Sequence, residues 1–427
     1  MAMKRRNFLQ AGGLATAATI LPSSVFGQNA PSKQATFGFV GTGGMGGANI
    51  DRVLGLKGKG ARILAVCDVD RVHAEGAAAK VNKEQGNDDC GIVGDFRELT
   101  RRDDIDAIVV STPDHWHALP AIDAIRNGKD VYVEKPLTLT VREGRVLVAE
   151  LRKHERVGQT GTQQRSDKSF RFVAEFIRNG GLGKVKRIEV LIPANNKQIG
   201  ASWEPQEVPK GLDYDMWLGP APWAPFHRQR THYQFRFNLD YAGGQTTNWG
   251  AHYLDIAQWA MGMDESGPVA VEGFGEFPQN GLFTAPTRVD FIVHYADGTP
   301  MTVRTRTDGV FDGNIIFHGE KGWLDVSRSK LKASDPKMLE TKFGDGDERV
   351  YFSDNHMGNF LDCIRSRKRC VSDLSIGHQT TSICNIGNIA MQLKRKLDWD
   401  PVKQVFADDV QANRLLQRPM RAPWRLV

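Results

Sequence analysis

Apolar residues come in short, nearly continuous runs over the first third of the chain, and segments with helical spacing separate these runs. The runs that we expect to form strands are Thr36–Val40, Ile63–Val66, Ala107–Ser111, Val131–Val133 and Val157–Gly161. The segments that we expect to form helices follow Gly46 and Asp70 and then cover Leu119–Asn127 and Val141–His154. Apolar strands that alternate with helices indicate a parallel sheet covered on both faces. We therefore expect an α/β domain over residues 34–163.

The pattern changes near residue 164, where polar and apolar residues begin to alternate as they do in half-buried strands. Such strands are expected at Lys184–Ile192, Val269–Phe277, Thr287–Tyr295, Met301–Thr307, Asn314–His318 and Trp323–Val326. Helices are expected at Asp167–Asn179, Asn355–Lys368 and His378–Lys396. This pattern predicts a second α/β domain, residues 164–427, with an open and mostly antiparallel sheet. We expect the open face to support homo-oligomers.

A long segment without periodicity, Pro193–Asp240, separates the first two of these strands and is rich in Trp, Arg and His. Long ordered loops are often functional. Aromatic faces and cationic donors suit a carbohydrate, although this composition is not unique to sugar sites.

Residues 1–30 contain no acidic side chain, and the stretch KRRNFLQ at residues 4–10 precedes a weakly apolar run that ends at Leu21. That run is too short to span a bilayer. A twin arginine followed by Phe-Leu resembles the twin-arginine (Tat) signal of proteins exported in the folded state. We expect a Tat-type signal, contact with the Tat machinery and a periplasmic or otherwise exported protein. The alternative is an uncleaved amphipathic N-terminus.

Charge and cysteine content narrow the classes of partner. The net charge of +6 includes three basic residues of the N-terminal segment, and no basic stripe with interleaved aromatics indicates nucleic-acid binding. No two cysteines have C-x-x-C spacing, so neither a zinc site nor a disulfide framework is indicated. We expect no metal, and one disulfide remains possible.

A glycine cluster follows the first expected strand. Gly41, Gly43 and Gly46 have the G-x-G-x-x-G spacing of a dinucleotide-binding turn, with Gly44 and Met45 between them. Asp68 ends the second strand about twenty residues later, where the ribose-binding acid of a Rossmann domain is expected. This acid favours NAD, whereas Arg71 leaves NADP open. The alternative is a structural turn in another α/β fold.

Other polar residues also fall at the carboxyl ends of expected strands, where open parallel sheets bind their ligands. Thr112 and Pro113 close the third strand and His117 follows, while Glu134 and Lys135 close the fourth before Pro136. From spacing alone, Lys135 is either a solvated strand cap or a charge directed at cofactor and substrate.

The helix after Gly243-Gly244 carries Asn248, His252 and Asp255 with spacing i, i+4, i+7, which places all three on one helical face. The flanking residues are apolar, so the helix is expected to be buried, and buried polar groups need partners. A ligand hydroxyl is one such partner; a polar surface stripe is the alternative.

Taken together, the glycine turn, Thr112-Pro113 with His117, Glu134-Lys135-Pro136 and the Gly243-Gly244 helix resemble the glucose–fructose oxidoreductase/inositol dehydrogenase (Gfo/Idh/MocA) family. The resemblance implies a Rossmann domain, a C-terminal α/β domain, and redox chemistry on sugars or cyclitols. It implies that Lys135 bridges cofactor and substrate, that His252 takes the hydroxyl proton and that Asp255 contacts substrate. We also assign Gln163 to the cofactor and Arg165 to the substrate.

The resemblance has one departure, because Asn248 stands where the family usually has aspartate. An amide can bind Lys135 or His252, but it adds no negative charge. We expect an oxidoreductase with tightly bound NAD or NADP that acts on a hydroxyl of a sugar, glycoside or cyclitol. One alternative is an NAD-dependent glycosidase of the oxidation–elimination type, whose better-known exported members generally lack the Glu-Lys-Pro motif. The other is a non-catalytic sugar-binding protein.

Overall fold

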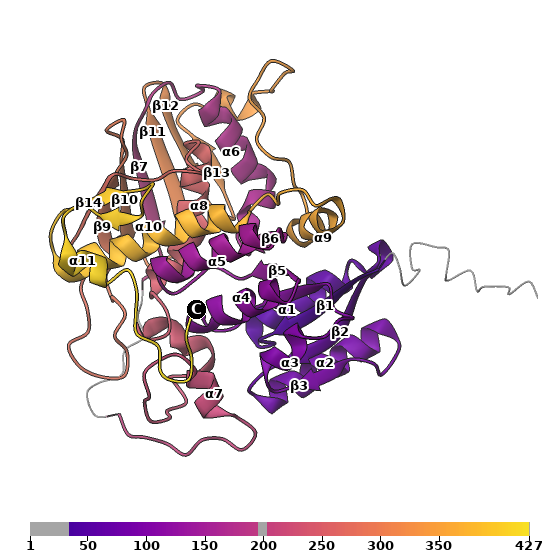
Figure 1. Ribbon diagram of the computed structural model, residues 1–427. Coiled ribbons are helices and arrows are strands. Elements are labelled where there is room, and N and C mark those ends of the chain that lie inside the picture. Colours follow the sequence, from indigo (N-terminus) through magenta and orange to yellow (C-terminus); the bar gives the residue numbers. More distant parts are fainter. Residues whose placement is uncertain (1–33, 195–202, 427) are drawn as a thin grey trace, which may run out of the picture.

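The computed structural model describes residues 34–194 and 203–426, and Figure 1 shows two packed α/β parts. The predicted signal, residues 1–30, lies outside the described residues. Within the described residues, no helix is both long and apolar enough to cross a membrane.

Six strands form the N-terminal sheet in the order β3-β2-β1-β4-β5-β6, and every neighbouring pair is parallel. Their bounds are β1 Ala35–Val40, β2 Ala61–Cys67, β3 Gly91–Val93, β4 Ala107–Val110, β5 Asp130–Val133 and β6 Gly158–Thr160. The predicted Rossmann sheet is therefore confirmed. The edge strand β3 was not predicted, because three partly exposed residues are too few to produce a pattern.

Helices cover both faces of this sheet. Helices α1 (Gly44–Leu54) and α2 (Arg71–Gln85) pack on one face, and α3 (Phe96–Thr100), α4 (Ala118–Arg126) and α5 (Val141–Lys153) pack on the other. This double cover explains why the central strands β4 and β5 are buried at every position.

Side-chain caps fix where two of these helices begin. Asp70 accepts a hydrogen bond from the backbone N–H of Val72 at the start of α2. Thr140 and Glu143 form a capping box at the start of α5. Each cap satisfies N–H groups that the first helical turn leaves free. The cap at Asp70 also holds the β2–α2 turn, which borders the cavity described below.

Nine strands form the second sheet in the order β13-β12-β11-β7-β10-β9-β8-β14-β15. Their bounds are β7 Val185–Ile192, β8 Ala270–Gly273, β9 Asp290–His294, β10 Pro300–Thr305, β11 Asn314–Gly319, β12 Gly322–Val326, β13 Leu331–Ala333, β14 Leu397–Asp400 and β15 Val405–Phe406. Only β7 and β10 pair in parallel among these strands of the described residues. Buried and partly exposed positions alternate along β9 and β10, which confirms the predicted open, mostly antiparallel sheet.

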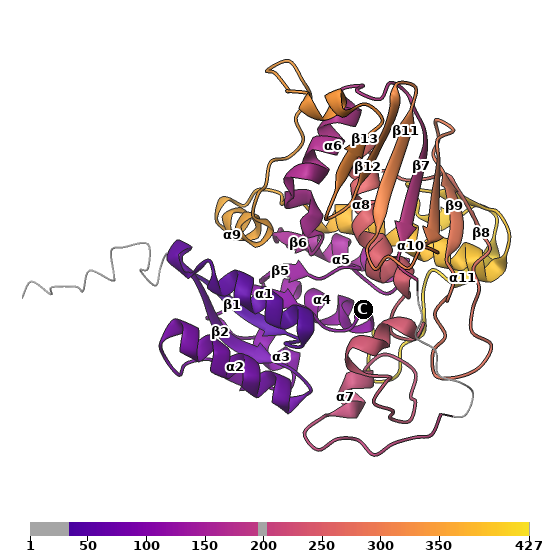
Figure 2. The same ribbon diagram turned by 180° about the vertical axis from the view of Figure 1, so that it is seen from behind.

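Three helices pack against the buried face of this sheet: α6 (Lys168–Arg178), α8 (Ala251–Ala260) and α10 (Leu374–Leu393). The same arrangement is seen from opposite sides in Figures 1 and 2. Every residue of α8 is buried, so the polar side chains of this helix lie in the interior. The expected burial of the helix is thus confirmed.

Some boundaries differ from the sequence-based expectation. Helix α10 begins at Leu374 rather than His378, because the Asp373 side chain caps it by accepting from the backbone N–H of Ser375. Strand β8 ends at Gly273 rather than Phe277, and β14 and β15 were not predicted. Both tail strands are short and pair only at the sheet edge, so their pattern is weak.

The two parts interlock through α9 (His356–Ser366), which belongs to the second half of the sequence. Its apolar side chains join α1 and α2 on one face of the N-terminal sheet. The rings of Phe37 and Phe360 lie 6.3 Å apart in an edge-to-face contact. The boundary predicted at residues 163–164 therefore does not separate two independent cores.

The long segment of residues 203–241 runs along the carboxyl edge of the N-terminal sheet. It contains α7 (Tyr214–Leu218) and a 3-10 helix (His232–Phe237), and otherwise keeps the expected irregular form. Backbone hydrogen bonds tie it to the β2–α2 turn, from Arg71 to Gly211 and from Asp213 to Val69. The segment is thus part of the wall around the ligand edge of the sheet.

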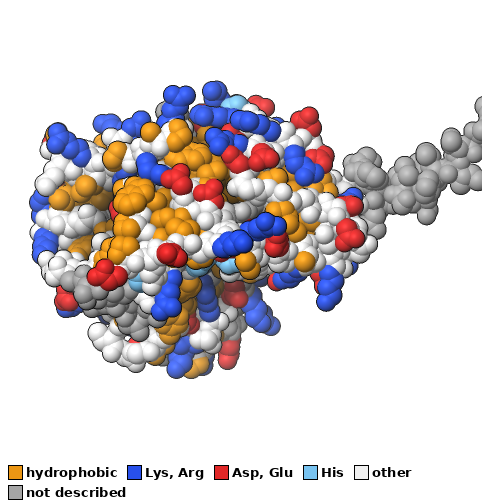
Figure 3. Space-filling model, turned by 90° about the horizontal axis from the view of Figure 1, so that it is seen from below, with side chains coloured by type: hydrophobic (Ala, Val, Ile, Leu, Met, Phe, Trp, Pro, Cys, Tyr) orange, Lys and Arg blue, Asp and Glu red, His pale blue; other side chains and the backbone are white. Residues whose placement is uncertain are grey.

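The five cysteines are all buried and unpaired, so the possible disulfide is absent from this structure. On the face shown in Figure 3, basic and acidic side chains are interspersed rather than gathered in one stripe.

Candidate active site

A cavity of about 380 Å³ lies at the carboxyl edge of the N-terminal sheet. Ligands of open α/β sheets bind at this edge. The predicted cofactor residues that line it are Gly41, Gly43, Gly44, Met45, Asp68, Thr112, Pro113, His117, Glu134 and Lys135. The segment of residues 203–241 closes the opposite side with Met216, Trp217, His232, Tyr233, Phe235 and Arg236.

The glycine turn has the geometry that the fingerprint requires. Gly41 has φ +85°, and a Cβ there would lie 2.8 Å from the Ser111 carbonyl oxygen. A Cβ on Gly46 would lie 2.1 Å from the Gly41 carbonyl oxygen. Gly43 precedes α1 without a side-chain cap, which leaves the first-turn N–H groups of α1 available to an anion.

The carboxylate of Asp68 is held rigidly at the end of β2. It accepts hydrogen bonds from the Thr42 backbone N–H at 2.8 Å, the Thr42 hydroxyl at 3.0 Å and the Asp70 N–H at 2.9 Å. Nearby, Arg71 donates to Glu75 at 2.6 Å and points along α2. Thr112 also lines the cavity, and its buried hydroxyl has no partner among the described residues. The glycine turn, the open N-terminus of α1 and the fixed Asp68 carboxylate together fit a dinucleotide.

His117 joins the loop after β4 to the loop after β5. Its Nδ1 lies 2.7 Å from the Pro136 carbonyl oxygen and its Nε2 lies 2.9 Å from that of Thr112. Burial is the main cause that lowers the pKa of His117 to about 4, and the charges of Lys135 and Arg236 add to it. A neutral His117 carries one ring N–H and can donate to only one of these two carbonyl oxygens, so it holds the loops together through one hydrogen bond at a time.

Glu134 lines the cavity and accepts a hydrogen bond from the first helix. Its Oε1 accepts from Asn49 Nδ2 at 2.9 Å, and its Oε2 accepts from the Lys135 backbone N–H at 3.3 Å. Burial raises the pKa of this carboxyl above its usual range.

Lys135 reaches from the end of β5 to the start of α8. Its Nζ donates to the backbone oxygen of Asn248 at 2.8 Å and to Asn248 Oδ1 at 3.3 Å. Burial first, and then the Arg236 charge, lower the pKa of Lys135 to about 8. Of the two readings left open by spacing, the structure supports the charge directed into the site rather than the solvated cap.

A π-helical turn, Thr246–Gly250, precedes α8 and contains Asn248, whose backbone oxygen accepts from Lys135. Such turns often occur at functional sites. Asn248 therefore does not follow the regular helical spacing assumed from sequence. Its Nδ2 donates to Gln245 Oε1 at 2.9 Å, which leaves Oδ1 facing Lys135 and Arg236.

The imidazole of His252 makes no hydrogen bond with the described residues. Its Nδ1 is enclosed without a partner in the described part of the chain, and the residue as a whole is 5% exposed. Neither His252 nor Asn248 is among the residues that line the cavity. Burial first, and then the charges of Lys135 and Arg328, hold the pKa of His252 well below its usual range. His252 is thus a neutral base that lacks a protein partner, as expected of a group that serves a ligand.

The remaining residues assigned to ligands have other surroundings. Arg165 donates to both carboxylate oxygens of Asp255, at 2.8 and 2.9 Å, and also to Asp264. Thr380 donates to Asp255 Oδ1 at 3.1 Å. The structure therefore places Arg165 and Asp255 in a buried ion pair beneath the site, and contact of either with substrate stays a prediction. Gln163 does not line the cavity, although its buried Oε1 has no partner among the described residues.

Two further charged residues that face the cavity were not predicted. Arg236 donates through Nε to Asn248 Oδ1 at 3.3 Å and through Nη1 to the Tyr233 carbonyl oxygen at 3.0 Å. Asp114 lies at the start of the loop after β4, and burial raises its pKa to about 7 against the opposing charges of Arg236 and Lys135. Arg236 comes from a segment without periodicity, so no pattern could place it.

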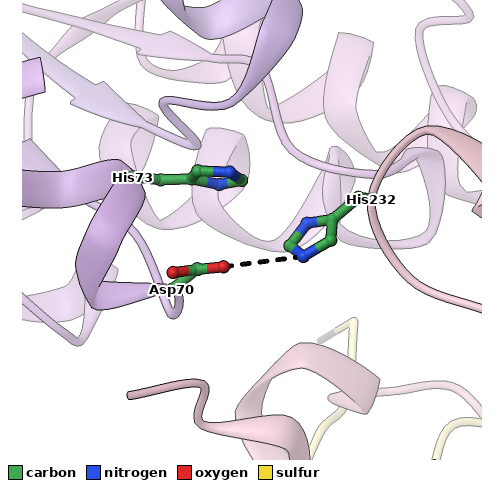
Figure 4. A group of neighbouring side chains, drawn as sticks. All are labelled: Asp70, His73 and His232. Atoms are coloured by element: carbon green, nitrogen blue, oxygen red, sulfur yellow. Dashed lines mark ion pairs between the residues drawn. The ribbon is translucent and has the colours of Figure 1, made fainter. Parts of the chain in front are cut away.

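At the mouth of the cavity, Asp70, His73 and His232 lie close together, as Figure 4 shows. His232 Nε2 is 3.5 Å from Asp70 Oδ2, and the rings of His73 and His232 are 5.0 Å apart. Their ligand-type atoms lie within 4.8 Å of one another, and this donor set could hold a divalent cation. The contacts observed here join the β2–α2 turn to the 3-10 helix and so hold the long segment over the cavity.

The fold and the cavity define a two-domain, dinucleotide-binding oxidoreductase scaffold. The model for the oxidoreductase family NAD-binding Rossmann fold matches residues 35–162, and the model for the oxidoreductase family C-terminal alpha/beta domain matches residues 197–426. The chain therefore belongs to the Gfo/Idh/MocA family, which confirms the resemblance seen in the sequence.

Among curated relatives, the chain is 34% identical over 161 residues to an alpha-N-acetylgalactosaminidase from Shewanella oneidensis. This match covers 33% of the chain and 35% of that protein, so it spans about a third of the relative. Solved structures share the fold at low identity. The WlbA dehydrogenase from Bordetella pertussis, in complex with NADH and UDP-GlcNAcA, has a TM-score of 0.64 at 17% identity and covers 86% of this chain and 99% of that one. Levoglucosan dehydrogenase with NADH and L-sorbose has a TM-score of 0.64 at 16% identity, with 86% and 98% covered.

Proposed function

We propose that this protein is an NAD(P)-dependent oxidoreductase that acts on a hydroxyl group of a sugar, glycoside or cyclitol. The observation that carries this proposal is the hydrogen bond from Lys135, which lines the cavity, to Asn248, four residues before the unpartnered His252, whose pKa is lowered first by burial and then by the Lys135 charge. An ammonium and a neutral imidazole that act on one substrate oxygen suit removal of a hydroxyl proton, because the imidazole can accept it while the ammonium stabilises the alkoxide.

The proposed roles follow from the geometry. The glycine turn and the first turn of α1 would hold the pyrophosphate, and Asp68 would hold the ribose. A bound nicotinamide supplies the hydride acceptor. His252 takes the hydroxyl proton at Nε2, which requires its own proton to be on Nδ1. Lys135 donates to the same substrate oxygen and stabilises its developing negative charge.

NAD is favoured over NADP by the charges around the ribose end of the cavity. Asp68 and Asp70 both border this end, and a 2′-phosphate placed there would face their negative charge. Arg71, the residue that left NADP open, is paired with Glu75. Tight retention of the cofactor is supported by the segment of residues 203–241, which lies over the cavity.

Substitution of Lys135 and His252 tests the proposal. Lys135→Ala and His252→Ala should each lower sugar turnover by about a hundredfold or more, with folding intact by circular dichroism. Lys153→Ala, which changes an exposed lysine at the end of α5, is the matched control. Unchanged turnover in both site variants would refute the site assignment.

The alternative reaction is NAD-dependent glycoside cleavage. The partial match to the alpha-N-acetylgalactosaminidase favours this alternative. Product analysis separates the two reactions. A keto-sugar or lactone supports the oxidoreductase, whereas a released monosaccharide with no net change of cofactor supports the glycosidase.

We also propose that the protein is exported through the Tat pathway, on the basis of residues 4–21. Replacing Arg5 and Arg6 by lysine should keep the protein inside the cell in a host with a Tat pathway. Export of that variant at the normal level would contradict the proposal.

A further inference from the structure

Lys135 and Arg236, the cations of the active site, have no carboxylate partner among the described residues, whereas the buried Arg165 has two. Arg165 is 1% exposed and is bound by the carboxylates of Asp255 and Asp264. Buried charges generally need such partners, because desolvation of an unpaired charge is costly.

Lys135 and Arg236, in contrast, share one neutral amide oxygen, Oδ1 of Asn248. Neither forms an ion pair with the described residues. Arg236 donates through Nε to Asn248 and through Nη1 to the Tyr233 carbonyl, and its guanidinium lies over the rings of Tyr233 and Phe235, each at 4.6 Å. Its Nη2 makes no hydrogen bond with the described residues, and Arg236 lines the cavity, so we infer that Nη2 can donate to a ligand.

The charges around this point leave a positive excess when either nearby carboxyl is protonated. Arg328 is a third cation near the site; it lies over the Trp249 ring at 4.9 Å and acts on both Lys135 and His252. The acids that act on Lys135 and Arg236 are Glu134, which is held by Asn49, and Asp114, whose pKa is about 7, while Asp312 lies near Tyr253 together with Arg328. Burial raises the pKa of both Glu134 and Asp114, and protonation of either carboxyl leaves a positive excess at Lys135 and Arg236.

We propose that the substrate of this site carries a carboxylate, as a uronic or aldonic acid does, and that Arg236 binds that carboxylate. This inference rests on the proposed function and names the substrate class for the same site. Arg236 is the residue of choice because a guanidinium presents parallel N–H groups that match a carboxylate, whereas Lys135 stays with the reacting hydroxyl.

The replacement of the family aspartate by Asn248 has a physical role in this arrangement. An aspartate would offset one of the two positive charges of Lys135 and Arg236 from within the protein and would repel a substrate carboxylate. With an amide, the substrate itself supplies the missing negative charge. A bound carboxylate also raises the pKa of His252, which brings this base closer to the working pH.

Calorimetric titration of the cofactor-loaded protein with matched sugars tests the inference. The pairs are D-glucuronate with D-glucose, D-galacturonate with D-galactose, and D-gluconate with D-glucitol. At least one acid should bind about tenfold or more tightly than its neutral partner, since a charge-assisted hydrogen bond distinguishes them. The preference should decline as salt is added. Arg236→Gln and Asn248→Asp should each reduce the preference, and Arg304→Gln, on the exposed side of β10, should not.

Two outcomes would overturn the inference: neutral sugars that bind as tightly as their acids, or no binding by any acid. Retention of the preference in Arg236→Gln would overturn the role of that residue. These failures are distinct from failure of the proposed function. A protein that holds no nicotinamide nucleotide refutes the proposed function, whereas a loaded protein that prefers neutral sugars refutes only the substrate class.

Discussion

The protonation state of Lys135 should control the activity of the proposed site. Its pKa of about 8 is lowered first by burial and then by Arg236. The proposed role needs the ammonium, so kcat/KM should fall as pH rises through about 8. Asn248→Asp adds a negative charge beside the ammonium and should raise the Lys135 pKa, which shifts the alkaline limb to higher pH.

The pH dependence of kcat/KM in the wild type and in Asn248→Asp measures this shift, because it reports groups of the free enzyme. An alkaline limb at the same pH in both proteins would contradict the assignment of this limb to Lys135. Asn248→Gln, which keeps the amide, controls for steric effects.

Asp255 has a structural partner that the sequence pattern did not reveal, and its predicted contact with substrate stays a prediction. Its carboxylate is fully buried against Arg165, so Asp255→Ala would leave Arg165 with only the partly exposed Asp264. We expect a loss of about 3–5 kcal/mol in the free energy of unfolding. Glu276→Ala, which breaks an exposed pair with Arg288, should cost under about 1 kcal/mol. Urea unfolding of both variants measures these free energies. Equal losses would show that the buried ion pair stabilises the fold no more than the exposed one does.

Sequence reasoning located the residues whose positions follow from backbone periodicity. Gly41, Asp68 and Lys135 end strands or follow them, so the topology of a parallel sheet brings them to one edge. Arg236 comes from a segment without periodicity, and Asn49 faces Glu134 across 85 residues of sequence. Such contacts depend on how elements pack, which a linear pattern does not encode.

At the scale of elements, the segment of residues 203–241 turns the open edge of a Rossmann sheet into an enclosed cavity. Its 3-10 helix places His232 at φ +50°, a left-handed conformation that costs energy outside glycine. That conformation directs the imidazole toward Asp70 and His73, as Figure 4 shows. The position of this segment could not be predicted, whereas its irregularity and functional placement could.

His232→Ala removes the ion pair to Asp70 and the ring contact with His73. The dissociation rate of bound nucleotide should rise by up to about fivefold, because a half-exposed ion pair contributes under about 1 kcal/mol. Displacement of the bound nucleotide, followed by fluorescence, measures this rate. His318→Ala, which removes an ion pair between His318 on β11 and Glu189 on β7, is the control. A rate unchanged from the wild type would show that the segment is held by its other contacts.

At the scale of the whole molecule, the active site exists only where the two parts meet. Lys135 comes from the N-terminal sheet, and Asn248 and His252 come from the start of α8 in the second part. The parts are held together by α9 on the N-terminal sheet and by the long segment over its carboxyl edge. The sequence predicted both sheets and their types. It did not predict that α9, which follows the second sheet in the chain, packs on the N-terminal sheet.

The proposed retention of the cofactor would suit the proposed export, because free NAD(P) should be scarce outside the cytoplasm. The segment of residues 203–241 lines one side of the cavity. A retained cofactor must be returned to its starting state by a second substrate, so the enzyme should couple oxidation of one sugar to reduction of another carbonyl compound.

The most direct test of the account is the nucleotide content of the purified protein. Acid denaturation should release close to one nicotinamide nucleotide per chain, identified by absorbance and mass spectrometry as NAD(H). Its redox state should change when a sugar substrate is added before denaturation. If no nucleotide is released and none binds on addition, the redox mechanism is refuted and a sugar-binding role takes its place.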